Sequence, residues 1–349
     1  MNKGGKRHVR VYNATDRIEY IDIAKGILII FVVLGHITTL PHILTYGMKA
    51  VITTFHMPAF FIINGMLTKA EKIQKTPVKQ FLLNRSYRLL IPYVFFEIMG
   101  GLWQMLFMGR GSVNLRGILY GIFTIHCHVG ADWFLPTIFF AEIGLFLLVK
   151  ICSKKYFLLV SGICFMVAFL LTDITYLVAC CRRILIALSF ILIGFSCKKL
   201  FMKKNIAVGA VSGLLTISIA YMNGIVDLSA RQFGNPLLYI LGSLIGTYYV
   251  LSVSQCLFGT LAKLLGRIGR SSLTIMGTHQ NLQVLFNVFC GSVYPLPLQI
   301  LVCFATIPYE ILMVNLCEKF VPFLVGIPLP VKRSKKSKRI TQNERTQQN

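Results

Sequence analysis

The sequence predicts an all-α, polytopic membrane helix bundle with about ten transmembrane helices and both termini in the cytoplasm. Of the 349 residues, 55% are hydrophobic and only 14% are charged, which leaves too little polar surface to cover a soluble fold. The apolar residues gather in long runs, and the basic residues gather in short clusters between these runs. The formal charge of +24 therefore indicates membrane-flanking loops, and no nucleic-acid partner is expected.

Each expected transmembrane helix is an apolar run of about 20 residues, the length needed to cross the hydrocarbon core. The ten runs lie at 23–43, 48–68, 86–108, 133–151, 156–172, 181–200, 205–222, 235–258, 271–291 and 296–318. Basic clusters follow the second, fourth, sixth and eighth runs, at 69–79, 150–155, 198–204 and 263–270. Every second loop is therefore positive, which places these loops and both chain ends in the cytoplasm.

These runs divide the chain into three parts. A basic cytoplasmic N-terminus is expected at 1–22, a transmembrane domain at 23–325, and a basic, disordered cytoplasmic tail at 326–349. No small-residue cleavage site follows the first run, so an uncleaved first helix is expected. Residues 116–131 are apolar but too short to span, and counting them as a span would invert every later loop. We therefore expect a re-entrant or interfacial segment on the outer face.

A few ionisable side chains fall inside the expected spans, where they are costly and usually serve a function. They are His36, His56, Glu97, Glu142, His279 and Glu310. His36 lies roughly 17 Å along its helix from Lys25, at the rise of an ideal α-helix, and His56 reaches a similar depth on the returning helix. A neutral imidazole can take a proton from a hydroxyl near neutral pH. His36 is therefore the candidate general base, and Asp22, His56 and Glu142 are candidates to tune it. The alternative role of a membrane histidine is a helix–helix hydrogen bond.

Three other stretches stand out. Arg85 and Arg88 share a helical face at the cytosolic entrance of the third span, and paired arginines suit a polyphosphorylated cytosolic molecule. The alternative is that they only flank a membrane span. In "FHMPAFFIINGML", Pro58 and the Asn64-Gly65 pair interrupt a span, which often marks a pocket. Trp133 opens the fourth span, where an ordinary aromatic belt residue is the alternative to a substrate contact. "HCH" at 126–128 is a weak cue, and no metal site is expected.

Together these stretches resemble the acyltransferase-3 family of multi-pass membrane O-acyltransferases, and within it the fucose 4-O-acetylase-like subgroup. The resemblance covers nearly the whole chain. Its motifs are Asp22-x-x-Lys25-Gly26 followed by His36, "FHMPAFF", Arg85-x-x-Arg88 followed by "LLIPY", "WFLP", and "GRSSLTIMGTH" ending at His279. Asn64 departs from the pattern, because serine is commoner before this glycine.

The resemblance implies ten or so helices, acetyl-CoA as acyl donor, and a hydroxyl of a cell-surface glycan or its lipid-linked precursor as acceptor. It implies a multi-pass protein of the bacterial cytoplasmic membrane in which His36 is essential. The expected donor site is Lys25, Arg85 and Arg88, and the expected substrate contacts are Trp133, Asn64 and His279. Because no soluble esterase-like domain is visible, either the membrane domain completes the transfer or the acyl group passes to a partner protein of polysaccharide synthesis. Direct transfer and a covalent acyl-enzyme both remain open. A secondary transporter and a glycan flippase or polymerase are the alternative functions.

Overall fold

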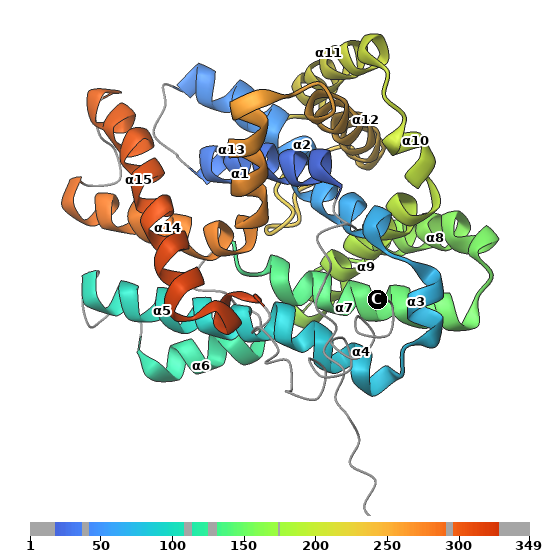
Figure 1. Ribbon diagram of the computed structural model, residues 1–349, viewed down its shortest axis with the longest axis horizontal. Coiled ribbons are helices and arrows are strands. Elements are labelled where there is room, and N and C mark those ends of the chain that lie inside the picture. Colours follow the sequence, from blue (N-terminus) through green and yellow to red (C-terminus); the bar gives the residue numbers. More distant parts are fainter. Residues whose placement is uncertain are drawn as a thin grey trace, which may run out of the picture.

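The computed structural model describes residues 18–36, 42–107, 114–124, 131–173, 175–290 and 296–327. Within these ranges the fold is all-α (Figure 1), and the exception is an isolated β-bridge between Asp227 and Gln232. The predicted fold class is therefore confirmed. Most of the predicted N-terminal segment at 1–22 and tail at 326–349 lies outside the described residues.

A helix lies at each of the ten predicted spans. These helices are α1 (Glu19–His36), α2 (His42–Leu67), α5 (Ile91–Phe107), α7 (Phe134–Ile151), α8 (Phe157–Leu170), α9 (Tyr176–Ser196), α11 (Ile206–Asn223), α12 (Pro236–Ser254), α14 (Ser272–Cys290) and α15 (Leu296–Phe320). Among the described residues, six segments are long and apolar enough to cross a membrane: Tyr46–Leu67, Val78–Phe107, Phe134–Ile151, Tyr176–Ser196, Ile206–Asn223 and Pro236–Ser254. The chain is thus a multi-pass helix bundle, and ten crossings stays a prediction.

Short helices connect the long ones, and several of them carry the basic clusters. They are α3 (Ala70–Lys75), α4 (Val78–Arg85), the π-helical turn η2 (Ser86–Leu90), α6 (Leu115–Thr124), the 3₁₀ turn η3 (Lys154–Tyr156), α10 (Lys198–Met202), α13 (Gly259–Arg270) and the 3₁₀ turn η4 (Pro322–Val325). The stretch predicted as re-entrant contains α6, which packs on α5 where Ile118 faces Gly101. The HCH motif at 126–128 lies outside the described residues.

Several predicted boundaries are wrong, among them those of the first and third spans. The first span was placed at 23–43, but the helix begins at Glu19 and residues 42–43 already belong to α2. Glu19 and Asp22 lie in the first turn of α1, where acidic side chains interact favourably with the helix dipole, so the helix extends beyond its apolar run. The third span was placed at 86–108, but continuous helix starts at Val78, within the basic segment.

Close helix contacts depend on glycines. A Cβ at Gly65 of α2 would collide with the carbonyl of Ile191 on α9, and a Cβ at Gly194 of α9 would collide with the carbonyl of Ile62. The same holds between α1 and α13, where Gly26 meets the Leu265 carbonyl and Gly269 meets the Asp22 carbonyl. Small residues at these crossings let the backbones touch, which is how helices commonly pack in a membrane.

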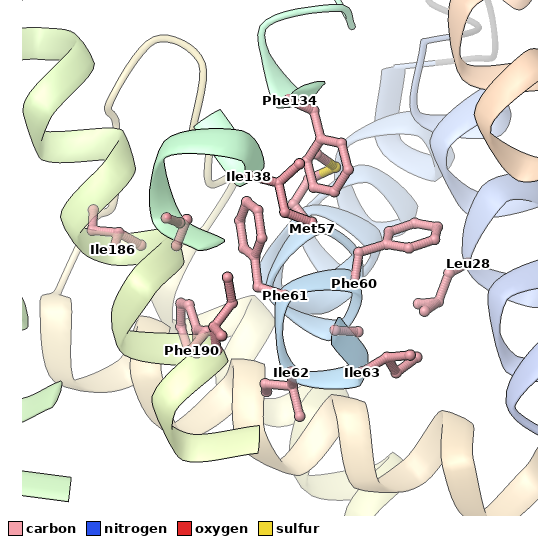
Figure 2. Close-up of a cluster of buried hydrophobic side chains, with 14 of the residues drawn as sticks. Leu28, Met57, Phe60, Phe61, Ile62, Ile63, Phe134, Ile138, Ile186 and Phe190 are labelled. Carbon is pink, nitrogen blue, oxygen red and sulfur yellow. The ribbon is translucent and has the colours of Figure 1, made fainter. Parts of the chain in front are cut away.

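Bulky apolar side chains fill the space where α2, α7 and α9 diverge from the close crossing. Figure 2 shows Phe60 and Phe61 projecting from α2 toward Phe134 of α7, with Ile186 and Phe190 on α9. The ring centroids of Phe61 and Phe134 are 5.0 Å apart in a stacked arrangement. This core fixes α2 in the centre of the bundle, with α9 on one side and α12 on another (Figure 1).

Candidate active site

Three histidines and one glutamine from α1, α2 and α14 form what we name the imidazole cluster: His36, His56, His279 and Gln280. The ring centroids of His36 and His279 are 5.1 Å apart. The Gln280 Nε2 lies 3.1 Å from His36 Nδ1. His56 is close enough to act electrostatically on His36. The structure thus brings His279 and Gln280 to His36 from a segment more than 240 residues away, while a contact between His36 and His56 stays a prediction.

Two of these histidines have a fixed ring orientation. His56 Nδ1 donates to the Ile52 carbonyl at 2.7 Å, and His279 Nδ1 donates to the Ile275 carbonyl at 2.9 Å. Since a carbonyl can only accept, Nδ1 carries the proton in each ring and the neutral form keeps its lone pair on Nε2. His279 is 0% exposed, and its Nε2 has no hydrogen-bond partner. A buried acceptor without a donor is costly to leave unused, and this nitrogen can accept a hydrogen bond.

The turn before His279 is tied to the last long helix. Thr278 Oγ1 donates to Glu310 Oε2 at 2.8 Å, and the second oxygen of Glu310 is buried without a hydrogen-bond partner. On the other side, Trp103 Nε1 of α5 donates to the Asn281 carbonyl at 2.8 Å. These bonds hold α14 from two directions, which fixes the position of His279 and Gln280.

The loop between α11 and α12 reaches the imidazole cluster. Val226 N donates to Thr53 Oγ1 of α2 at 3.2 Å, which docks this loop on the helix that carries His56. Asp227 of the loop and Lys49 of α2 both act electrostatically on His36. The Asp227 carboxylate accepts hydrogen bonds from Ser229 Oγ at 2.8 Å and Ala230 N at 2.9 Å. These bonds fix the Asp227 side chain within its loop.

A second polar group, which we name the carboxylate cluster, joins α2, α4 and α7 through Asn64, Arg85 and Glu142. Asn64 Nδ2 donates to Glu142 Oε1 at 2.6 Å, and Arg85 Nε lies 2.9 Å from Glu142 Oε2. The Glu142 side chain is 4% exposed and that of Arg85 is 28% exposed. Glu142 thus pairs with a predicted donor-site arginine, and no described contact joins it to His36, which it was expected to tune.

The same-face prediction for Arg85 and Arg88 assumes regular α-helix, and the backbone there is different. Arg85 ends α4, and Arg88 lies in the π-helical turn Ser86–Leu90. A π turn holds more residues than an α turn and changes the angle between successive side chains, and such turns are frequent at functional sites. Arg85 turns toward Glu142, while its guanidinium also lies 5.4 Å from the Phe81 ring.

The remaining predicted site residues lie apart from both clusters. Asp22 and Lys25 are half-buried on the part of α1 that contacts α13. Asp22 is fourteen residues before His36, or about 21 Å along a helix, so it does not tune the imidazole by contact. Trp133 is 7% exposed, so it is not an ordinary lipid-facing belt residue. Its ring lies 5.6 Å from the Arg183 guanidinium.

The two clusters lie at different depths on one helix. His56 and Asn64 are eight residues apart on α2, which corresponds to about 12 Å along the helix axis. His56 is near the middle of the segment Tyr46–Leu67, and Asn64 is near its end. The sequence prediction missed Gln280 and Asp227 as neighbours of His36. The polar run Thr278-His279-Gln280-Asn281 in an apolar helix was a usable signal for the first of them.

The comparisons with known proteins agree with this architecture. A family model described as an acyltransferase domain, that of the acyltransferase-3 family, matches residues 18–314. This match covers well over half of the chain, so the protein belongs to this family and is a membrane acyltransferase. No curated protein and no solved structure matches the chain.

Proposed function

We propose that the protein transfers an acetyl group from acetyl-CoA, bound from the cytoplasmic side, to a hydroxyl of a cell-envelope glycan or its lipid-linked precursor. His36 would act as the general base. The observation that carries the proposal is the pair of clusters on α2, because the imidazole cluster offers proton acceptors in mid-helix while Arg85 and Arg88 lie near the end predicted to face the cytoplasm.

The donor's phosphates would bind at the cytoplasmic end of this arrangement. Arg85 uses Nε toward Glu142, and its terminal nitrogens keep donors for phosphate oxygens, since guanidinium carries five N–H groups. Arg88 and Lys25 would add charge. The narrow pantetheine arm would then run along α2 from Asn64 toward His56, a path of about 12 Å. The nucleotide would thus stay outside the hydrocarbon core while its thioester reaches the imidazole cluster.

In the transfer step, the acceptor oxygen would attack the thioester carbonyl carbon. The new C–O bond forms, the C–S bond breaks, His36 takes the hydroxyl proton, and that proton returns to the departing thiolate of CoA. For this role His36 must accept at Nε2. A half-turn of the Gln280 carboxamide would place its oxygen opposite Nδ1, so that Nδ1–H donates and Nε2 stays free. The His279 Nε2, which accepts no hydrogen bond within the described residues, would help to orient the acceptor hydroxyl.

The resemblance to the fucose 4-O-acetylase-like subgroup supports an acetyl donor and a sugar hydroxyl, and it supports a bacterial cytoplasmic membrane location. The decisive test is release of free CoA by the purified protein in lipid nanodiscs. We expect thiol release from acetyl-CoA that depends on an added glycan acceptor, together with an acetylated product detected by mass spectrometry. A protein that binds or moves glycans without consuming acetyl-CoA would be a transporter or flippase, and the proposal would then be wrong.

A further inference from the structure

Two adjacent arginines, Arg182 and Arg183, lie in the first third of α9, near the end predicted to face the cell exterior, and their surroundings differ. Arg182 Nη1 lies 2.6 Å from Asp173 Oδ1, and its Nε donates to the Ala168 carbonyl at 2.9 Å. Asp173 also accepts from Arg231 Nε at 2.6 Å. The charge of Arg182 is therefore compensated by a carboxylate, and its role in joining the ends of α8 and α9 is structural.

Arg183 is buried, with 3% of its surface exposed, and it has no such partner. Its Nη2 lies 3.2 Å from Cys180 Sγ and 3.4 Å from the Tyr176 hydroxyl, while its Nε has no hydrogen-bond partner. In the part of the chain that the structure describes, no carboxylate lies within ion-pair distance of this guanidinium. Removing an arginine from water without a counter-charge is strongly unfavourable. A buried cation of this kind suggests a position that an anion completes.

Two aromatic rings bracket the guanidinium. Its Cζ lies 5.6 Å from the centroid of Trp133 and 5.9 Å from that of Tyr176. Cation–π attraction offsets part of the desolvation cost but brings no negative charge. On the side toward the bundle centre, Ile186 lies one turn further along α9, and Phe134 follows Trp133 in the chain (Figure 2).

The carboxyl group next to Trp133 in the chain does not neutralise Arg183. Burial, together with the Glu97 carboxylate, raises the pKa of Asp132 well above its usual value. Both oxygens of Asp132 lack a hydrogen-bond partner. No ion pair joins Asp132 to Arg183 within the described residues, and the protonated carboxyl that a raised pKa favours can donate a hydrogen bond to a bound anion.

We propose that Arg183, Trp133 and Tyr176 bind the anionic group of the acceptor, a carboxylate or phosphate carried by a sugar. The guanidinium fork matches the paired oxygens of these anions, and aromatic faces pack on the C–H faces of sugars. This inference rests on the proposed function for the identity of the ligand as an acceptor. It narrows the acceptor class from any glycan to an anionic one.

Depth makes the assignment consistent with the imidazole cluster. Arg183 is seven residues from the start of α9 and His56 is fourteen residues from the start of α2, which correspond to about 10 Å and about 21 Å of helix. The two helices contact each other. Arg183 therefore lies nearer the predicted outer end of its helix than His56 does, as expected for a group that meets an acceptor arriving from the outer side, opposite the predicted route of acetyl-CoA.

The first experiment measures anion binding alone, by thermal unfolding of the protein in nanodiscs with glucuronate, glucose 1-phosphate or neutral glucose. We expect the wild type and the matched control Arg182→Met to be stabilised by at least one of the anionic sugars and not by glucose. Arg183→Met should lose this stabilisation, with binding weaker by roughly 10- to 100-fold, the cost of losing charged hydrogen bonds. The response to each sugar separates a carboxylate ligand from a phosphate ligand.

The ligand-free melting temperature distinguishes this site from a structural arginine. Replacing an uncompensated buried cation by a similar-sized apolar side chain should leave stability unchanged or raise it. A large fall in the melting temperature of Arg183→Met, or equal stabilisation of both variants by the anionic sugars, would overturn the inference.

The last experiment compares acyl transfer to glucuronate with acyl transfer to glucose. If transfer occurs but Arg183→Met leaves the KM of glucuronate unchanged, this inference fails alone. If anion binding needs Arg183 but acetyl-CoA is never consumed, the proposed function fails and the anion site stands.

Discussion

The two polar clusters on α2 differ in the charge of the groups that contact each other: one contains an ion pair, and the histidines of the other are hydrogen-bonded to neutral groups. In the carboxylate cluster, Asn64 donates to Glu142 Oε1 and the Arg85 guanidinium lies 2.9 Å from Glu142 Oε2. The carboxylate charge is therefore paired with a cation, although Glu142 Oε2 and Asn64 Oδ1 accept no hydrogen bond among the described residues. In the imidazole cluster, about 12 Å away along the helix, the histidines have only neutral hydrogen-bond partners, and His279 Nε2 has none among the described residues. An ion pair such as that of Glu142 and Arg85 holds helices together. A neutral imidazole whose nitrogen accepts no hydrogen bond can instead accept one from another molecule.

The largest effect is expected at the imidazole cluster. His36→Ala should insert, fold and bind acetyl-CoA as the wild type does, because the donor's phosphates would contact Arg85 and Arg88. Its turnover should fall by about 100-fold or more, the usual contribution of a general base. Steady-state thiol release and equilibrium binding of acetyl-CoA check the two halves of this prediction. Loss of donor binding in this variant would place His36 in the CoA site instead.

The next effect concerns the donor side. Arg85→Ala should raise the KM for acetyl-CoA by roughly tenfold or more with a smaller change in kcat, and Arg85→Lys should restore only part of the affinity because lysine keeps the charge but not the fork. The control is Lys79→Ala, an exposed neighbouring cation. An unchanged KM in Arg85→Ala would limit this arginine to pairing with Glu142.

A smaller effect, on stability rather than turnover, is expected at Glu142. Glu142→Gln keeps an oxygen for Asn64 and removes the charge that faces Arg85. Because Arg85 is partly exposed and can be solvated, we expect a loss of about 1–2 kcal/mol in unfolding free energy. Thermal melts of the variant in nanodiscs measure this, and Asn64→Ala provides the comparison for the amide bond alone. A melting temperature equal to that of the wild type would mean that the ion pair contributes nothing measurable.

The smallest expected effect is on the pH dependence of stability, and it concerns Asp173, which lies outside the imidazole cluster. Burial opposes the ionised form of Asp173, but hydrogen bonds from Arg182 and Arg231 outweigh it and lower the pKa of Asp173 below its usual value of 3.8. A lowered folded-state pKa contributes stability that is present above the unfolded-state pKa and is lost as the pH falls through the folded-state pKa. Asp173→Asn should therefore be less stable than the wild type at neutral pH, by at most about 1 kcal/mol. The two proteins should converge in melting temperature as the pH falls below 3.8 and through the folded-state pKa, and a constant difference at all pH values would contradict this.

Much of the fold could be predicted because membrane insertion demands long apolar runs, and each predicted run contains a helix. The presence of His36, His56 and His279 within apolar runs was equally visible. The partner of Glu142 could not be predicted, because residues at one depth in the membrane can contact several helices. Only the packing of α2, α4 and α7 brings Arg85 to Glu142. The π-helical turn at Ser86–Leu90 was missed for a similar reason, since no residue pattern in "SYRLL" distinguishes it from an α turn.

The central claim is that His36 is the base, and the pH dependence of transfer tests it most directly. In the wild type, kcat/KM for the acceptor should rise with pH as the imidazole loses its proton and then become constant, since only the neutral ring can accept the hydroxyl proton. His36→Gln keeps a hydrogen-bonding amide but cannot take up the proton, so its residual activity should be low and should lack this rise. A His36→Gln variant that retains both near-normal turnover and the wild-type pH profile would contradict the account and assign the base to another residue.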